Sequence, residues 1–175
     1  MKKLVLPLLL LISIASYSQS DNSSAQKNRT EVKFNVFSTF LGAVDFEFER
    51  TLNNHSSVGM SFRQSFEKSE HNEIAVFYRK YLGKKYASGF FIEGFGMYHS
   101  KYYYVSTISK NEDIFRFSHN SALGLGIGYK LISKKGLILQ THIGAGRKLI
   151  NGKADNGDRG ESYLGKIGIS IGFSF

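Results

Sequence analysis

Two residues of this 175-residue sequence, His119 and Ser121, could carry nucleophilic chemistry. Two positions apart on a strand, they would point to the same face. A serine beside an imidazole is the pairing in which the histidine accepts the proton of the nucleophile. Glu161, in a later loop, could orient that imidazole as the third member of a triad. A His-x-Ser pair also arises often by chance, so a hydrolytic site remains the alternative interpretation.

Three carboxylates and a glycine run are the other candidates for chemistry. Asp155, Asp158 and Glu161 could offer oxygen ligands to Ca²⁺, but their spacing differs from that of an EF-hand loop. The run from Gly124 to Gly128 lies within a strand pattern with no helix after it, unlike a dinucleotide-binding turn. The sequence has no cysteine, which excludes disulfides, thiolate metal sites and cysteine nucleophiles. We therefore expect no metal and no cofactor.

The elements that must position these residues are strands, because apolar residues alternate with polar or small ones over most of the chain. In the stretches 123–131 and 167–175 every second residue is apolar, and glycine, serine or lysine stands between. Such a period of two gives a strand one apolar face and one small or charged face. We count eight such segments, approximately 31–38, 43–52, 56–65, 72–81, 89–100, 117–131, 137–147 and 162–175.

The connections between these segments alternate in length. Turns near 53–54, 83–88 and 133–136 are tight, whereas 66–71, 101–116 and 148–161 are longer polar links, and a short first link lies near 39–42. Short turns at one end and longer loops at the other are typical of bacterial outer-membrane barrels. The sequence therefore predicts an all-β fold, an eight-stranded antiparallel up-and-down transmembrane β-barrel.

A water-soluble eight-stranded barrel, such as a lipocalin, would also alternate, with the polarity of its two faces reversed. Lysine-bearing turns at one end and a last strand ending on Phe173 and Phe175 favour the membrane, because that ending resembles the assembly signal of outer-membrane barrels. Tyrosines near strand ends would form the aromatic girdles. These are Tyr78, Tyr81, Tyr98, Tyr102, Tyr103, Tyr104 and Tyr163.

The first residues predict export. Residues 1–18 have two lysines, an apolar core too short to span a bilayer comfortably, and small residues before a cleavage site, as in a signal peptide. Residues 19–30 are predicted to be a flexible periplasmic tail, and 31–175 the barrel. We expect the outer membrane of a Gram-negative bacterium as the location. An even number of strands would place both termini in the periplasm, where the last strand would meet the outer-membrane assembly machinery.

The face opposite the apolar one would line the lumen. Its predicted charges are five acids and five bases: Asp45, Glu47, Glu49, Glu73 and Glu93, with Lys33, Arg63, Arg79, Lys130 and Lys166. The interior of an eight-stranded barrel is just wide enough to be filled by side chains, so these charges should pair and plug it. A narrow ion pathway along the same network is the alternative.

The net positive charge of the chain should lie mainly at the periplasmic rim. The residues concerned are Arg50, Lys80, Lys84, Lys85, Lys134 and Lys135. Anionic phospholipid headgroups are one partner for such a rim, and simple solvation of the charges is the other interpretation. An exported chain whose basic residues lack interleaved stacking aromatics is not expected to bind nucleic acid.

Three stretches resemble a family of small outer-membrane β-barrel proteins within the wider group of OmpA- and OmpX-like eight-stranded barrels. They are FEFERTLNNHSSVGMSF, IAVFYRKYLGKKYASGFFIEGFG and LGLGIGYKLISKKGLILQTHIGAGR. The resemblance implies fold and location, and no catalytic residue, because the family has no established activity. The His119–Ser121 pair separately resembles the His-x-Ser of the outer-membrane lipid A deacylase, whose other motif residues are absent. We therefore expect a monomeric, non-enzymatic barrel with a surface-interaction or envelope-structural role and an unknown surface ligand; the alternatives are a lipid-modifying hydrolase and a narrow channel.

Overall fold

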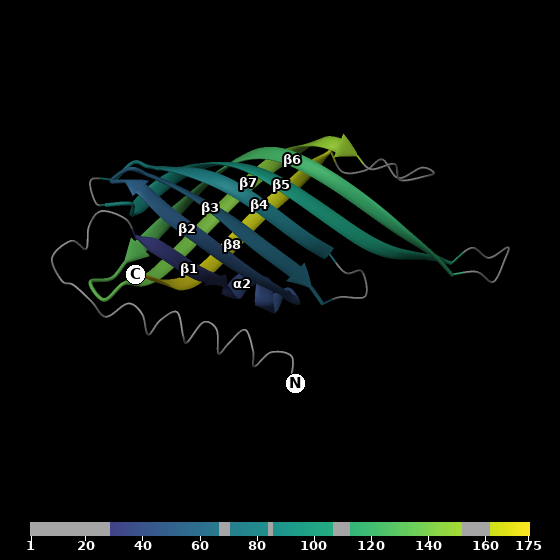
Figure 1. The fold of residues 1–175 in the computed structure, drawn as a ribbon, viewed down its shortest axis with the longest axis horizontal. Helices are drawn as coiled ribbons and strands as arrows, with labels where there is room; N and C mark the ends of the chain where they lie inside the picture. The colour runs from purple at the N-terminus through teal and green to yellow at the C-terminus, as the bar shows by residue number, and fades with distance from the viewer. Residues whose placement is uncertain (1–28, 67–70, 84–85, 107–112, 152–161) are drawn as a thin grey trace.

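The computed structural model describes residues 29–66, 71–83, 86–106, 113–151 and 162–175. They form a closed barrel in which every strand pairs antiparallel with the next one and the last strand pairs with the first (Figure 1). The strands are β1 (Thr30–Asn35), β2 (Ala43–Asn53), β3 (Ser56–Ser65), β4 (His71–Tyr81), β5 (Gly89–Ser106), β6 (Asp113–Ile132), β7 (Leu137–Asn151) and β8 (Tyr163–Ser174). The predicted eight-stranded up-and-down topology is confirmed.

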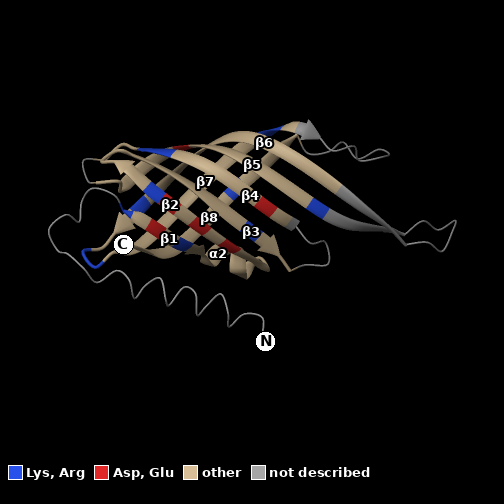
Figure 2. Ribbon diagram, in the orientation of Figure 1, with Lys and Arg blue, Asp and Glu red and all other residues tan. Residues whose placement is uncertain are grey.

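The polarity of the wall is the reverse of that of a water-soluble protein. On β8, Ile167, Ile169 and Ile171 are 44–48% exposed, whereas Lys166 and Ser170, which alternate with them, are buried inside the barrel. The other strands repeat this arrangement, with leucine, isoleucine and aromatic side chains outside. Acidic and basic residues lie on neighbouring strands (Figure 2). The alternation in the sequence thus separates an apolar outer surface from a charged interior.

The barrel has a turn end and a loop end. The start of β1 and the end of β8 meet at the turn end. There the backbone N–H groups of Thr30 and Phe175 each donate to the carbonyl of the other at 3.0 Å. The turn between β6 and β7 packs on this seam, because the N–H of Ser174 donates to the carbonyl of Gly136. Gly136 has a φ of +84°, and a Cβ there would lie 2.8 Å from the carbonyl oxygen of Ser174. Only glycine fits both constraints without strain.

The loop end carries the short helix α2 (Val36–Phe40), where the sequence had predicted a first strand extending to residue 38 and no helix. Asn35 ends β1 and caps the helix, because its side chain accepts a hydrogen bond from the N–H of Ser38. Gly42, at a φ of +76°, lets the chain turn into β2. Within the described part of the chain, no helix is long and apolar enough to cross a membrane.

β5, β6 and β7 are longer than predicted, and β7 ends at Asn151 rather than at residue 147. β5 and β6 continue as a paired hairpin to Ser106 and Asp113, so Tyr102, Tyr103 and Tyr104 lie in a strand rather than in the predicted loop 101–116. Tyrosine, phenylalanine and isoleucine favour strand geometry, and they pair across this hairpin. The predicted leader and most of the predicted tail lie outside the described residues. Thr30, assigned to that tail, begins β1.

Candidate functional site: the charged interior of the barrel

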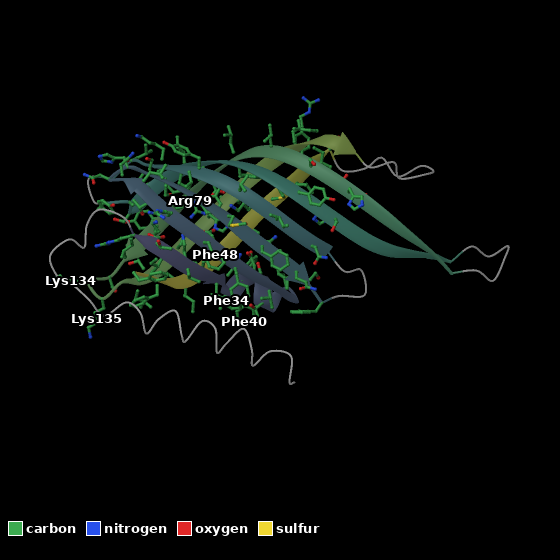
Figure 3. All side chains as sticks on the ribbon, in the orientation of Figure 1. Phe34, Phe40, Phe48, Arg79, Lys134 and Lys135 are labelled. Carbon is green, nitrogen blue, oxygen red and sulfur yellow. The ribbon has the colours of Figure 1, made fainter. Side chains whose placement is uncertain are left out.

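Arg79, on β4, is fully buried and is the central residue of the charge network in the interior. Its Nε lies 2.7 Å from Glu93 Oε2, its Nη1 lies 2.7 Å from Glu47 Oε1, and its Nη2 donates to Glu47 Oε2 at 3.0 Å. Nη1 also donates to Glu49. The guanidinium thus bonds acids from β2 and β5 (Arg79 is labelled in Figure 3). Such planar, multidentate pairing fixes the relative positions of three strands.

Two lysines extend this network toward the turn end. Lys33 Nζ, on β1, contacts Glu49 and lies 2.7 Å from Glu47 Oε1 and 3.1 Å from Glu31 Oε2. Lys130 Nζ, on β6, lies 2.9 Å from both oxygens of Glu31 and from Glu49 Oε1. β1, β2 and β6 are thereby joined across the lumen by ion pairs that contain no exposed side chain.

Glu31 was missing from the predicted lumen set, although the first predicted strand began at this residue. It is fully buried and is paired with both lysines. Its position follows from the period of two, because it lies two residues before Lys33 on the same face. With Glu31 included, the interior set has six acids and five bases.

Tyr81 is a second correction, since it had been assigned to an outer aromatic girdle. Its side chain points inward and is 1% exposed, its hydroxyl donates to Glu49, and Lys130 Nζ lies 4.5 Å from the centre of its ring. Tyr81 stands two residues after Arg79 and therefore shares its inward face. Tyr78, Tyr98 and Tyr163 do lie outside, at 45–65% exposure.

The remaining predicted charges divide between two places. Lys166 Nζ on β8 donates to Glu93 Oε1 at 2.6 Å and so belongs to the network around Arg79. Asp45, Arg63 and Glu73 form a separate cluster nearer the loop end: Arg63 Nη2 donates to Asp45 Oδ2 at 2.9 Å, and Arg63 Nη1 lies 3.7 Å from Glu73 Oε2. This loop-end cluster is partly exposed, because the side chain of Arg63 retains 22% of its accessible surface.

An apolar layer separates the two groups of charges. On β4 the inward side chains run Glu73, Ala75, Phe77, Arg79, and on β5 Phe95 and Met97 follow Glu93. Ala75, Phe77, Phe95 and Met97 pack together and are at most 4% exposed. The ring of Phe77 also stacks on the Arg79 guanidinium, with the Cζ atom 4.0 Å from the ring centre. The lumen therefore alternates charged, apolar and charged along its length.

Inward-facing glycines make room for these rings. A Cβ on Gly124 would lie 2.3 Å from Phe95 Cζ, and one on Gly144 would lie 2.9 Å from Phe95 Cε1. Gly128 and Gly59 receive Phe91 and Phe77 in the same way. The glycines of the strand pattern thus make room for three aromatic rings, each of which lies over its glycine partner on the neighbouring strand.

Gly124→Ala should consequently lower the free energy of unfolding by about 1–3 kcal/mol, because the added methyl group meets both the Phe95 ring and the backbone of β7. Gly94→Ala is the matched control: Gly94 faces outward on β5, where a new Cβ meets only Leu125 Cδ2 at 4.0 Å. Urea titration in phospholipid vesicles, followed by circular dichroism, measures both variants. Equal effects of the two substitutions would contradict the close contact between Phe95 and Gly124.

Of the predicted hydrolytic triad, the structure describes His119 and Ser121. The exposed His119 stacks on Tyr98, with ring centres 5.9 Å apart, and its Nδ1 lies 2.7 Å from the Tyr98 hydroxyl. Ser121 is on β6 on the same outer face, paired with Tyr98 across the hairpin. Glu161, Asp155 and Asp158 lie outside the described residues. Within the described chain, no group of three His, Asp or Glu side chains could hold a metal ion.

Comparisons with other proteins agree with this geometry. Residues 4–156 match the family described as Protein of unknown function (DUF3575). The chain belongs to this family. It is similar in structure to the N-terminal β-barrel domain of Pseudomonas aeruginosa OprF, with a TM-score of 0.52 and 11% sequence identity over 85% of this chain and 98% of that domain. No curated protein matches the sequence. At this identity the similarity to OprF shows the fold.

Proposed function

We propose that this protein is an integral outer-membrane barrel with a plugged polar lumen and a non-enzymatic role in surface interaction or envelope structure. The observation that carries the proposal is the reversed polarity of the wall: large apolar and aromatic side chains are exposed on the outside of β2 to β8, and paired charges fill the interior. In water, so large an apolar surface would drive association. In a bilayer it is the surface that contacts lipid, and a closed barrel leaves no strand edge unpaired.

The plug is proposed from the contents of the lumen. The network around Arg79 joins β1, β2, β4, β5, β6 and β8, and the apolar layer of Phe77 and Phe95 lies next to it. A permeating ion would have to displace paired charges and then pass the packed side chains of the apolar layer, and both steps are unfavourable. Wild-type protein in planar bilayers should therefore give no single-channel current. Steady conductance would support the channel instead.

The proposed location follows from the same surface. The turn end, with both ends of the barrel sheet, would face the periplasm, and outer-membrane lipids would surround a monomer. Lys134 and Lys135 stand at the β6–β7 turn of that end (Figure 3). The hydrolase alternative predicts a changed lipid A mass when the protein is expressed and an unchanged mass for Ser121→Ala. We expect lipid A of the same mass in cells without the protein, in cells with the wild-type protein and in cells with Ser121→Ala.

Heat-dependent mobility tests the barrel in detergent. The unheated protein should migrate differently from the boiled protein on an SDS gel, because the closed ladder of eight strands keeps the unheated barrel compact. Fractionation of the cells that produce the protein should recover the protein with the outer membrane. Folded protein recovered from the soluble periplasm at normal yield would refute the membrane proposal.

A further inference from the structure

An apolar groove of about 970 Å³ crosses the outer face of the barrel from β2 to β6. Its floor contains Gly94 and Gly96, which face outward on β5, and its walls include Val76 on β4 and Leu123 on β6. A Cβ on Gly96 would reach only ordinary contact, 3.5 Å from Leu123 and 3.7 Å from Val76. The two missing side chains leave a hollow in a surface that is otherwise covered by large apolar groups.

The groove begins at the turn end and runs toward the middle of the wall. Arg50 lines its first part and stands three positions before Asn53, the end of β2. From there the cross-strand register passes through Val58 and Tyr78 to Gly94. Leu123, at the other end, lies nine positions before Ile132, the end of β6. Because the strands are tilted, this row of partners climbs from the rim into the wall.

The chemistry of the groove differs between its two ends. Arg50 is exposed at the rim, and Lys80 is exposed on β4, two positions beyond Tyr78 on the same outer face. Neither side chain makes an ion pair with any other residue that the structure describes. Apart from Thr30, Tyr78 and the inward-facing Glu49, the rest of the lining is apolar or glycine, and it includes Phe48, on the near face in Figure 3. A basic end followed by an apolar trough matches a lipid with an anionic head.

We propose that this groove holds one anionic glycerophospholipid, with its phosphate between Arg50 and Lys80 and one acyl chain over Gly94 and Gly96. The inference rests on the proposed membrane location and goes beyond it. The other lipids around the barrel contact side chains that stand out from the wall. A chain in the groove lies flat against the backbone of β5 and gains close contact along its length. The fixed basic end selects the headgroup.

Native mass spectrometry of the barrel, extracted from membranes into mild detergent and mixed with equal phosphatidylglycerol and phosphatidylcholine, tests this proposal. Wild-type protein should retain one phosphatidylglycerol in preference to phosphatidylcholine. Gly94→Leu/Gly96→Leu should reduce retention by about tenfold or more, a loss of about 1.4 kcal/mol. The matched control is Gly165→Leu, an outward glycine on β8 with no atom within 4 Å of an added Cβ, and it should retain the lipid normally.

A second pair of variants separates the headgroup from the groove. Arg50→Gln/Lys80→Gln should bind the two lipids equally, whereas Lys134→Gln/Lys135→Gln, which removes the same charge at the same end, should keep the preference. This pair also tests the proposal if the leucine variant does not fold. Heat-dependent gel mobility reports independently whether each variant folds as a barrel. A failure of the proposed membrane barrel is thereby distinguished from a failure of the proposed lipid site.

Three results would overturn the lipid assignment. Equal retention by the variants and their controls would mean that the bound lipid lies elsewhere. A wild-type dimer that Gly94→Leu/Gly96→Leu converts to monomer would place a second copy of this chain in the groove, since outward glycines also allow close packing between chains. When lipid A is added to the same mixture, its preferential retention over phosphatidylglycerol would assign the site to the other leaflet.

Discussion

Replacing Arg79 by methionine should lower the free energy of unfolding by about 3–5 kcal/mol. The methionine fills a similar volume, but Glu47, Glu49 and Glu93 then lose the guanidinium that bonds all three in the interior. A buried carboxylate without its partner carries the full cost of its lost solvation. Urea titration in phospholipid vesicles, followed by circular dichroism, measures the change.

The neighbouring residue supplies the control for this prediction. Lys80 follows Arg79 on β4 and points to the outer face, so Lys80→Met should change the free energy of unfolding by no more than about 0.5 kcal/mol. Glu93→Gln combined with Arg79→Met should cost less than the sum of the two single changes, because the pair bonds directly at 2.7 Å. Small, additive effects would mean that water enters the lumen and that the network does not hold the strands.

The fold could be read from the sequence because one local rule governs nearly every strand. Ile167, Ile169 and Ile171 alternate with Lys166 and Ser170, and this period of two specifies both the strand and its inner face. The same parity places Arg79 and Glu93 inside, where the structure has them. The helix α2 departed from the rule, because Asn35 bonds the N–H of Ser38 and starts a helical turn within an apolar run.

The errors at Glu31 and Tyr81 came from giving side-chain type more weight than parity. Glu31 follows a polar stretch and was left out of the lumen set, and Tyr81 ends a strand as a girdle tyrosine would. Each lies two residues from an inward base, Lys33 and Arg79 respectively, so parity alone assigns both correctly. The same rule places Phe77 inside, although an aromatic residue in a barrel strand suggests contact with lipid.

The packing of rings on glycines could not be predicted from any single strand. Phe95 on β5 fits against Gly124 on β6 and also against Gly144 and Gly146 on β7. These contacts depend on the register of three strands and on the diameter of the closed barrel, which no local pattern contains. The outer groove at Gly94 and Gly96 was missed for the same reason, since its walls come from β4 and β6.

Deleting Phe175 should reduce the amount of protein in the outer membrane severalfold, with material accumulating in the periplasm or being degraded. Two contributions are removed together. The deletion takes away the pair of 3.0 Å backbone hydrogen bonds with Thr30 that completes the seam between β1 and β8. It also removes the terminal aromatic side chain, exposed at 40%, that we propose is recognised during assembly together with Phe173.

Two substitutions separate these contributions, measured by fractionation at low expression. Phe175→Ala keeps the backbone pair with Thr30 and loses only the ring, whereas Phe175→Tyr keeps an aromatic ring as well. If the ring is the signal, Phe175→Ala should resemble the deletion and Phe175→Tyr the wild type. A normal yield for Phe175→Ala beside a low yield for the deletion would assign the effect to closure of the seam. A normal yield for the deletion itself would remove Phe175 from assembly, because a terminal residue that serves only the folded barrel can fray at little cost.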